Sequence, residues 1–477
     1  MFFALQKIQY CKMNKGAPFP FREWVSQAIE NEQEKNRKGM AMKKIRTSTR
    51  TRLAILTITV CALSLSVFSS CKPSGTEIDE ANFPDPVFRE YVSGQFDTNG
   101  DGKLSAAEKR AAARIDVSEM EIETLEGIEH FASLASLSCR DCWLAELDIS
   151  KNAALAELDC SMTIFEGSGF SPLLNCLTSL DTSKNTSLRK LNCNGNRLAS
   201  LDLGSNAALT ELDCGENRLT TLDLSNNTAL EVLRCKAMEL ASLDLGNNAA
   251  LRDLDCSMDH LAALDVSKNA ALAELNCSYN QLAALDISSN PALEYLGCGC
   301  NQLTVLDVSS NPALGYLGCE GNQLTELDVS SNPALTSLYC DGNQLAEVDV
   351  SSNPALESLA CENNQLTKLD VRSNPALVYL FCVGNQLTEL DVSSNPALES
   401  LFCGDNQLTE LDVSSNPALA SLDCMNNQLT KLDVSSNPAL GYLNCMNNQL
   451  TELDVSNNPV LEPDSIYSDI PPTKDNG

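Results

Sequence analysis

The chain has 477 residues, which is enough for several compact domains or for one long repeat array. Its formal net charge is −31, and the part that follows residue 71 carries 21 basic and 60 acidic residues, a net charge of −39. A surface of this charge repels nucleic acids and anionic lipid headgroups, and it suits cations or basic partners.

Residues 43–71 read KKIRTSTRTRLAILTITVCALSLSVFSSC. Five basic residues precede the apolar run Leu53–Phe68, which is short for a transmembrane helix and typical of a secretory signal peptide. The ending VFSSC resembles a bacterial lipobox, although Phe stands where Leu is usual, and the resemblance implies that Cys71 is lipidated. An uncleaved membrane anchor is the alternative. We expect residues 1–70 to be an N-terminal extension and a lipoprotein signal peptide, followed by a linker over 71–81.

The stretch FDTNGDGKLSAAE, residues 96–108, has the residue order of an EF-hand calcium loop and also resembles half of a dockerin. Oxygen ligands in this order suit a hard cation, and the flanking sequences predict helices, so residues 82–114 are expected to form a small EF-hand-like segment. A solvated acidic turn is the alternative. One loop in an exported chain indicates a structural calcium site rather than a sensor. The expected ligands at loop positions 1, 3, 5, 7, 9 and 12 are Asp97, Asn99, Asp101, Lys103 (through its carbonyl), Ser105 and Glu108.

A cysteine recurs every 21 residues from Cys193 to Cys445, and Cys139 and Cys160 extend this ladder upstream of an insertion at about 162–173. A fixed period of this size indicates a solenoid. We expect the solenoid to span about residues 115–461, with the insertion forming a protruding loop.

The repeat LTSLYCDGNQLAEVDVSSNPA, residues 335–355, contains LxxLxCxxNxL followed by a near copy, LxxLDVSxNPA. It resembles the 21-residue leucine-rich repeat with nested half-repeats of bacterial surface proteins. Residues 122–139 also resemble the opening of internalin-like arrays. The resemblance implies a repeat solenoid and, by analogy, adhesion or host interaction.

Alternation along each strand points Leu338 and Cys340 inward and Tyr339 outward. The Asn343 amide can bond the backbone of the adjoining loop. The second half-repeat has a similar pattern, so we expect short parallel strands on both sides of each coil, little α-helix, and coils about 4.8 Å apart.

The ladder cysteines occupy a slot that Leu fills in ordinary repeats, so they are expected to be buried. Their parallel Cβ vectors disfavour disulfides between neighbouring coils, which predicts free thiols. In CRDC, Cys142 falls on the Asn slot of its repeat, which favours a packing role over a metal or redox role. Cys176 and Cys300 lie off the ladder, and Cys300 is expected near the surface.

Seven of the eight aromatic residues between Leu177 and Leu461 lie three or one positions before a ladder cysteine, which places them on one outer sheet face; Tyr279 is the exception. Aromatic and acidic side chains together are typical of protein- or glycan-binding surfaces. The alternative is that aromatics merely suit strands, but that predicts them on both half-repeats, and LDVSSNPA has none. The expected binding residues are Tyr295, Tyr316, Tyr339, Tyr379, Phe381, Phe402, Tyr442, Glu320, Asp341 and Glu362.

An aspartate recurs in the second half-repeat from Asp181 to Asp454 and should face solvent. Like charges one coil apart repel by about 1 kcal/mol, and hydrogen bonds to the following Ser-Ser-Asn turn can compensate. Weak cation binding is the alternative. Residues 462–477 show no cap pattern and are expected to be a loose tail.

No nucleophile, phosphate loop or zinc spacing accompanies the two histidines, so we do not expect an enzyme. The sequence favours an exported bacterial lipoprotein of the outer membrane or cell surface that is anchored at Cys71. We expect it to be a monomeric array that binds a protein or glycan and no nucleic acid. The alternatives are a structural spacer or periplasmic or outer-membrane assembly factor without a soluble ligand, and an accessory binding protein of glycan degradation.

Overall fold

The structure is a computed structural model that describes residues 75–163 and 177–473. Contacts divide the chain into Met1–Lys72 and Pro73–Gly477, and the fold below is that of the second unit. The predicted signal peptide, the predicted lipidation site at Cys71, Cys176 and most of the predicted insertion lie outside the described residues. No helix within the described ranges is long and apolar enough to cross a membrane.

Two short helices precede the coils, as the sequence predicts. Asp85 begins the first, because its side chain accepts hydrogen bonds from the backbone N–H groups of Val87 and Phe88, at 2.9 Å each. A capping box between Ser105 and Glu108 begins the second. The elements are β1 (Thr76–Glu77), α3 (Pro86–Phe96), β2 (Lys103–Leu104) and α4 (Ala106–Ala111), and β1 pairs antiparallel with β2.

This helical segment covers the first coil of the solenoid. The ring of Phe131, from the first coil, lies 5.3 Å from that of Phe96 and 6.4 Å from that of Phe83. The Tyr91 hydroxyl accepts a hydrogen bond from the Asp116 N–H at 3.1 Å. The segment therefore shields the apolar end of the array, as terminal units of solenoids must.

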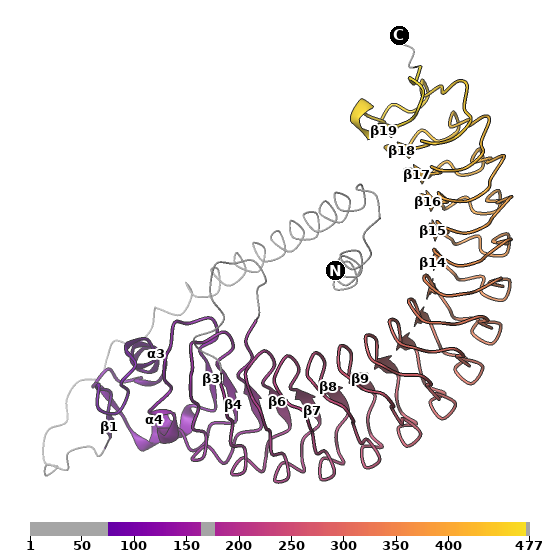
Figure 1. Cartoon of the computed structure of the whole chain (residues 1–477). Coiled ribbons are helices and arrows are strands. Elements are labelled where there is room, and N and C mark those ends of the chain that lie inside the picture. Colours follow the sequence, from indigo (N-terminus) through magenta and orange to yellow (C-terminus); the bar gives the residue numbers. More distant parts are fainter. Residues whose placement is uncertain (1–74, 164–176, 474–477) are drawn as a thin grey trace, which may run out of the picture. The chain divides into compact units, whose positions relative to one another are not determined.

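The coils stack through one parallel ladder of short strands, in a 21-residue register from β4 to β18 that is interrupted by the insertion between β5 and β6. The pairing is linear from β3 to β19, and the strands line the inner side of a curved array (Figure 1). The strands are β3 (Arg114–Asp116), β4 (Ser136–Ser138), β5 (Glu157–Asp159), β6 (Lys190–Asn192), β7 (Glu211–Asp213), β8 (Val232–Arg234), β9 (Asp253–Asp255), β10 (Glu274–Asn276), β11 (Tyr295–Gly297), β12 (Tyr316–Gly318), β13 (Ser337–Tyr339), β14 (Ser358–Ala360), β15 (Tyr379–Phe381), β16 (Ser400–Phe402), β17 (Ser421–Asp423), β18 (Tyr442–Asn444) and β19 (Ile466–Tyr467), with 3-10 turns η1 (Ile128–His130) and η2 (Pro463–Ser465).

Leucine and cysteine fill the interior of each coil, and in most coils an asparagine three residues after the ladder cysteine joins the coil to the previous one. Leu338 and Cys340 are fully buried, as predicted. The Asn343 amide donates to the carbonyls of Cys319 (3.0 Å) and Cys340 (3.1 Å), while its oxygen accepts from the Leu324 N–H (2.9 Å). The predicted role of this asparagine is confirmed, and it satisfies backbone groups that a tight coil would otherwise strand.

The second half-repeat forms turns instead of the predicted strand, so the expectation of strands on both sides is wrong. The Asn353 N–H donates to the Val350 carbonyl at 3.1 Å and closes a local turn. Its buried amide donates to Val329 and Asn332 carbonyls of the preceding coil, at 3.0 and 2.8 Å. Because side chains and local turns satisfy the backbone there, no strand ladder forms on the outer side.

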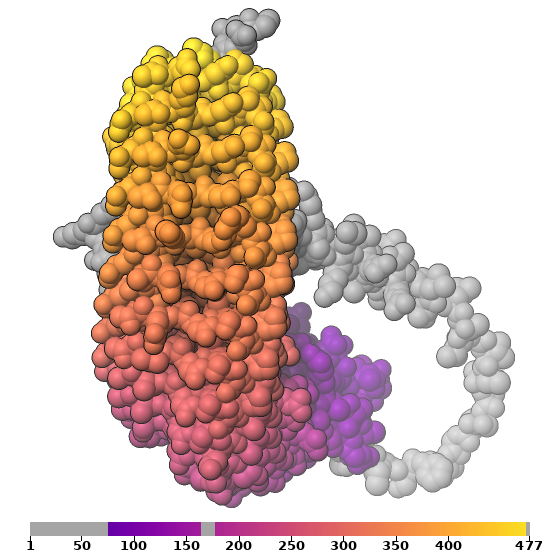
Figure 2. All heavy atoms as spheres, turned by 90° about the vertical axis from the view of Figure 1, so that its right-hand side faces the viewer, coloured from indigo at the N-terminus to yellow at the C-terminus, as the bar shows by residue number. Residues whose placement is uncertain are grey.

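Residues 463–473 continue the stack, although their sequence carries no repeat pattern. β19 pairs with β18, and the Thr473 N–H donates to the Leu453 carbonyl at 2.8 Å. The segment expected to be a loose tail thus covers the last coil as far as residue 473. Figure 2 shows the outer side of the C-terminal coils, where they pack directly against one another as parallel bands.

Candidate ligand-binding face

The strand face is the solvent-facing side of the parallel ladder, formed by the residues three before, one before and one after each ladder cysteine. All seven predicted aromatic residues lie there, on strands β11 to β18. The strand register sets their side chains about 4.8 Å apart from coil to coil, close enough for rings to touch.

Three tyrosines form one run of rings. The centroids of Tyr295 and Tyr316 are 4.4 Å apart with an interplanar angle of 10°, a stacked pair. Tyr316 and Tyr339 follow at 5.5 Å and 37°. Burial raises the pKa values of Tyr295 and Tyr316 well above the ordinary value, so both stay neutral hydrogen-bonding phenols at physiological pH.

Two glycines leave room for the rings of Tyr295 and Tyr316 to extend along their own strands. A Cβ atom added at Gly318 would lie 3.2 Å from the Tyr316 hydroxyl and 3.1 Å from a Glu320 carboxylate oxygen. At Gly297 it would lie 3.4 Å from the Tyr295 hydroxyl. Each tyrosine therefore occupies space left open by the glycine two residues later, a role that the sequence analysis missed.

A second run of rings continues toward the C-terminus. Successive centroids from Tyr379 through Phe381, Phe402 and Tyr442 to Tyr467 are separated by 6.5, 5.2, 6.4 and 5.8 Å. Tyr467, 37% exposed, was not predicted, because it belongs to the capping segment and not to a repeat. The aromatic part of the strand face thus extends from β11 to β19.

The strand face changes character along the array. From Cys139 to Cys277 it carries both charges, including ion pairs of Lys190 with Glu211 (2.6 Å) and Arg234 with Asp253. From Cys298 onward its charged residues are all acidic, and no Lys or Arg occupies any of its positions. These acids, all half-buried, are Glu320, Asp341, Glu362 and Asp423.

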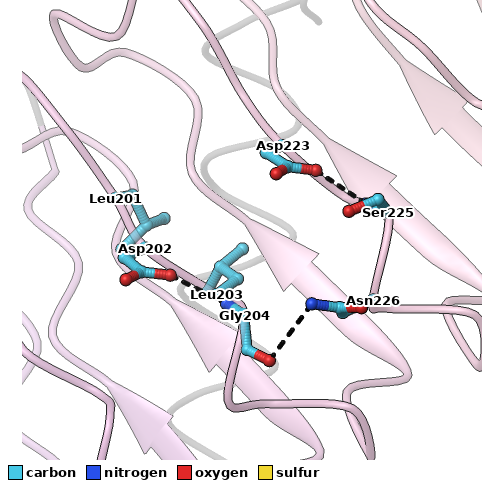
Figure 3. Close-up of a pocket in the computed structure, with 7 residues that line it drawn as sticks. All are labelled: Leu201, Asp202, Leu203, Gly204, Asp223, Ser225 and Asn226. Atoms are coloured by element: carbon cyan, nitrogen blue, oxygen red, sulfur yellow. Dashed lines mark hydrogen bonds between the residues drawn. The ribbon is translucent and has the colours of Figure 1, made fainter.

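The aspartates of the second half-repeat lie on the side of the coil opposite the strand face, and each accepts a hydrogen bond within its own turn. In Figure 3, Asp202 accepts from the Gly204 N–H and Asp223 from the Ser225 N–H, each at 2.9 Å, and the Asn226 amide reaches the Gly204 carbonyl at 3.4 Å. The hollow that they line has a volume of about 50 Å³, far below that of a small-molecule site. The predicted compensating hydrogen bonds are confirmed, and they lower the pKa of aspartates such as Asp223.

The predicted calcium loop is folded as a compact turn. Gly100 and Gly102 adopt positive φ angles of 72° and 76°, and their N–H groups donate to the Asp97 carboxylate at 2.8 and 2.9 Å. The N–H of Asp101 donates to the Asn99 side-chain oxygen at 2.9 Å. These side chains thus gather around the turn.

Glu108, expected at the last ligand position, makes different contacts. Its carboxylate accepts from the Thr98 hydroxyl (2.7 Å) and the Ser105 N–H (2.8 Å), and these hydrogen bonds lower its pKa to about 2. Lys103 donates through its ammonium group to Glu77, while its carbonyl remains part of the loop backbone. Over the described ranges no three His, Cys, Asp or Glu side chains are grouped as metal ligands. The donor types suit calcium, but Glu108 would have to exchange its present hydrogen bonds to bind it.

The cysteines are packing residues. Every described ladder cysteine is a free, buried thiol, and burial raises the pKa of each; that of Cys160 rises to about 12. Cys142 occupies the asparagine slot, as predicted, and its thiol donates to the Val117 carbonyl at 3.1 Å. Cys300 is partly exposed.

The stacked coils, asparagine ladder and strand face define a leucine-rich-repeat solenoid. Comparison with protein-family models gives no match, and neither does comparison with curated proteins. Among solved structures, the chain is similar to the functional domain of InlJ from Listeria monocytogenes, which includes a cysteine ladder: the identity is 33%, the TM-score is 0.68, and the match covers 83% of this chain and 81% of that one. The chain therefore belongs to the internalin-like leucine-rich-repeat family.

Two further structures share the fold. A leucine-rich-repeat protein of Leptospira interrogans has 24% identity and a TM-score of 0.64, with 72% of this chain and 92% of that one covered. An internalin (InlF) of Listeria monocytogenes has 18% identity and a TM-score of 0.53, with 84% and 99% covered.

Proposed function

We propose that the protein is an exported, lipid-anchored binding protein that recognises a protein ligand through the aromatic part of its strand face. The observation that carries the proposal is the two runs of rings, Tyr295 to Tyr339 and Tyr379 to Tyr467, which lie on one side of the solenoid. Aromatic side chains contribute more binding energy per residue than others do at protein interfaces. Solenoids of this family are protein-interaction modules, which supports a protein partner.

The test is a face variant in which Tyr316, Tyr339, Tyr379 and Phe381 are replaced by Ser. Immobilised mature protein captures candidates from cell-surface extracts, and each candidate is then purified and its affinity measured directly. We expect the face variant to lose at least about 100-fold in affinity, since each lost anchor costs about 1 kcal/mol or more.

A matched control removes exposed apolar side chains elsewhere. Val305 and Val460 are 61% and 56% exposed and lie off the strand face. The double variant Val305→Ser, Val460→Ser should bind as the wild type does. Equal affinity of the face variant and the wild type, with both folded by circular dichroism, would refute the assignment.

A glycan ligand is the second candidate, and the stacked Tyr295–Tyr316 pair favours it, because flat aromatic surfaces also bind sugar rings. It corresponds to an accessory role in glycan degradation. A glycan array separates the two: binding to defined glycans that the face variant loses supports the glycan, and binding only to captured proteins supports the protein. If neither class binds, a structural spacer or assembly factor without a soluble ligand is favoured.

Export and anchoring belong to the proposal, on the evidence of residues 43–71. Lipidation at Cys71 would attach the protein to a bacterial membrane, in an outer-membrane or cell-surface location. Intact mass and N-terminal sequencing of the membrane-extracted protein test this. A mature N-terminus at any residue other than Cys71, or a Cys71→Ser variant that stays anchored, contradicts it.

We also propose one structural calcium ion in the 97–108 loop, held by side-chain oxygens of Asp97, Asn99, Asp101 and Ser105, the Lys103 carbonyl and, after rearrangement, Glu108. The proposal rests on the oxygen donors that the loop brings together. Calcium should raise the melting temperature of the wild type by mass action and leave Asp97→Ala unchanged. Equal shifts in both proteins, or none in either, argue against the site.

A further inference from the structure

We infer that the strand β1 is a positioning element of the proposed calcium site: its pairing with β2 holds the middle of the 97–108 loop in place, and calcium in turn orders β1. This inference rests on the calcium site proposed above. It adds to that site residues 75–78, which lie outside the loop and supply no ligand.

Backbone contacts join β1 to three consecutive positions of the loop. β1 pairs antiparallel with β2, so Glu77 lies opposite Lys103. The Ile78 N–H donates to the Gly102 carbonyl at 2.9 Å and extends the pairing by one residue. These contacts reach loop positions 6, 7 and 8. Position 7 offers its ligand through the backbone carbonyl of Lys103, so the conformation of the paired strand sets the direction of that ligand.

Side chains hold β1 on the loop and on α4. The Glu77 carboxylate forms an ion pair with the Lys103 ammonium group. The Thr76 hydroxyl accepts a hydrogen bond from the Lys109 ammonium at 3.0 Å, and Ile78 packs against the buried core. Two strands of two residues each have little stability of their own, so these contacts determine how firmly β1 stays paired.

Glu77 also neutralises the positive charge of the loop. Lys103 is the only basic residue within 97–108, and its ammonium group, if left without Glu77, would repel calcium or pair with an acidic ligand such as Asp101. In the structure that ammonium group pairs with Glu77, which comes from β1. The pairing therefore leaves the loop carboxylates available to a cation.

The coupling between β1 and calcium works in both directions. If pairing of β1 strengthens calcium binding by some factor, calcium must strengthen the pairing of β1 by the same factor. Thr76 stands five residues after Cys71 in the sequence. Calcium therefore controls the order of the strand that follows the proposed lipid anchor.

The experiment measures the calcium affinity of the mature protein by isothermal titration calorimetry. Ile78→Pro removes the N–H that donates to Gly102, and Ile78→Val is its matched control, because it keeps that N–H and an apolar side chain. Glu77→Gln removes the charge that neutralises Lys103. Its control, Glu80→Gln, removes an equal charge from an exposed position of the same segment.

We expect Ile78→Pro to bind calcium at least about tenfold more weakly than the wild type, and Glu77→Gln about three- to fivefold more weakly. Both controls should stay within about twofold of the wild type. Hydrogen exchange gives a second readout: calcium should slow exchange of the Ile78 amide by at least about tenfold in the wild type and leave it unchanged in Asp97→Ala.

Wild-type affinity in both Ile78→Pro and Glu77→Gln overturns this inference and leaves the calcium site intact, as does calcium binding that does not slow exchange at Ile78. A wild type that binds no calcium overturns the calcium site and this inference together, and leaves the proposed strand-face ligand unaffected. If Ile78→Pro also speeds exchange in α3, the helical segment itself has opened. In that case equal affinities of Glu77→Gln and Glu80→Gln overturn the inference, and a weaker affinity of Glu77→Gln supports it.

Discussion

Replacing Asp259 with Asn should stabilise the solenoid in a strongly pH-dependent way. Asp259 occupies the slot that holds Asn343 in its own coil, but a carboxylate cannot donate hydrogen bonds. It accepts from the N–H groups of Met238 and Leu240, at 3.0 and 3.4 Å, while its second oxygen is buried without a partner. The preceding coil has Met238 in the same slot, so two consecutive coils in the middle of the array lack this asparagine.

Burial raises the pKa of Asp259 from 3.8 to about 7, against the opposing effect of the two backbone hydrogen bonds. Asp255 repels the charge as well, and the other titratable groups around it are the thiols of Cys214, Cys235 and Cys256. Because the pKa of Asp259 is higher in the folded than in the unfolded protein, its neutral carboxyl stabilises the fold fully below pH 3.8. This stabilisation is lost as the pH rises through about 7. The side chain is 4% exposed. A shift of this size corresponds to at most about 4 kcal/mol, and to about 2 kcal/mol if solvent screens part of it.

The assay is urea denaturation of the wild type and of Asp259→Asn at pH 4, 5, 6, 7 and 8. Other carboxylates titrate in both proteins, so the quantity of interest is the difference in unfolding free energy between them. We expect this difference to grow by about 2–4 kcal/mol between pH 4 and pH 8, and hydrogen exchange at pH 8 to be slower around the substituted coil. A difference that stays constant across this range would refute the assignment of a neutral, buried carboxyl.

Three further outcomes follow from the fold. Asn343→Ala should lower the free energy of unfolding, measured by urea denaturation, by about 2–4 kcal/mol, because it leaves buried carbonyls and the Leu324 N–H unpaired. A decrease below about 0.5 kcal/mol would argue that these asparagine contacts do not hold neighbouring coils together. A small thiol reagent should modify Cys300 in the native protein and reach the ladder cysteines only after unfolding, and ready labelling of the ladder in the native state contradicts their burial. Truncation after residue 461 should lower the melting temperature and speed hydrogen exchange in the last coils first, whereas unchanged exchange there would mean that residues 462–473 do not act as a cap.

The architecture was predictable because one period fixes the position of every residue in it. The 21-residue spacing places leucines and cysteines inside, asparagines at the turns and aromatics on the strand face, and the structure agrees at each of these positions. The same reasoning gave a wrong prediction for the second half-repeat. The alternation of apolar and polar residues in LDVSSNPA predicts a strand. In the structure, its backbone instead forms hydrogen bonds within its own turns and with buried asparagine amides.

Two other features carried no periodic signal. The capping segment 463–473 has no repeat residues, and only the pairing of β19 with β18 brings Tyr467 to the strand face. The tyrosines near Gly297 and Gly318 were predicted from register, but the direction in which their rings extend depends on space left by missing Cβ atoms, which a pattern of apolar residues does not encode. For the calcium loop the sequence signal is strong and the structure is less complete. The residue order is specific to calcium loops, but Glu108 hydrogen-bonds to other groups and does not complete a set of ligands.

The uniform register of the coils also has a genetic consequence. From Cys277 to Cys424 each coil makes the same asparagine contacts with its neighbours, so removing or duplicating a unit of 21 residues there rejoins equivalent partners. The segment LTELDVSSNPAL occurs identically at 324–335, 387–398 and 408–419. Sequence identity of this kind favours unequal recombination, and an array that gains or loses such a unit keeps the same coil-to-coil contacts. The number of coils, and with it the reach of the protein, can therefore vary in steps of about 4.8 Å without any compensating mutation.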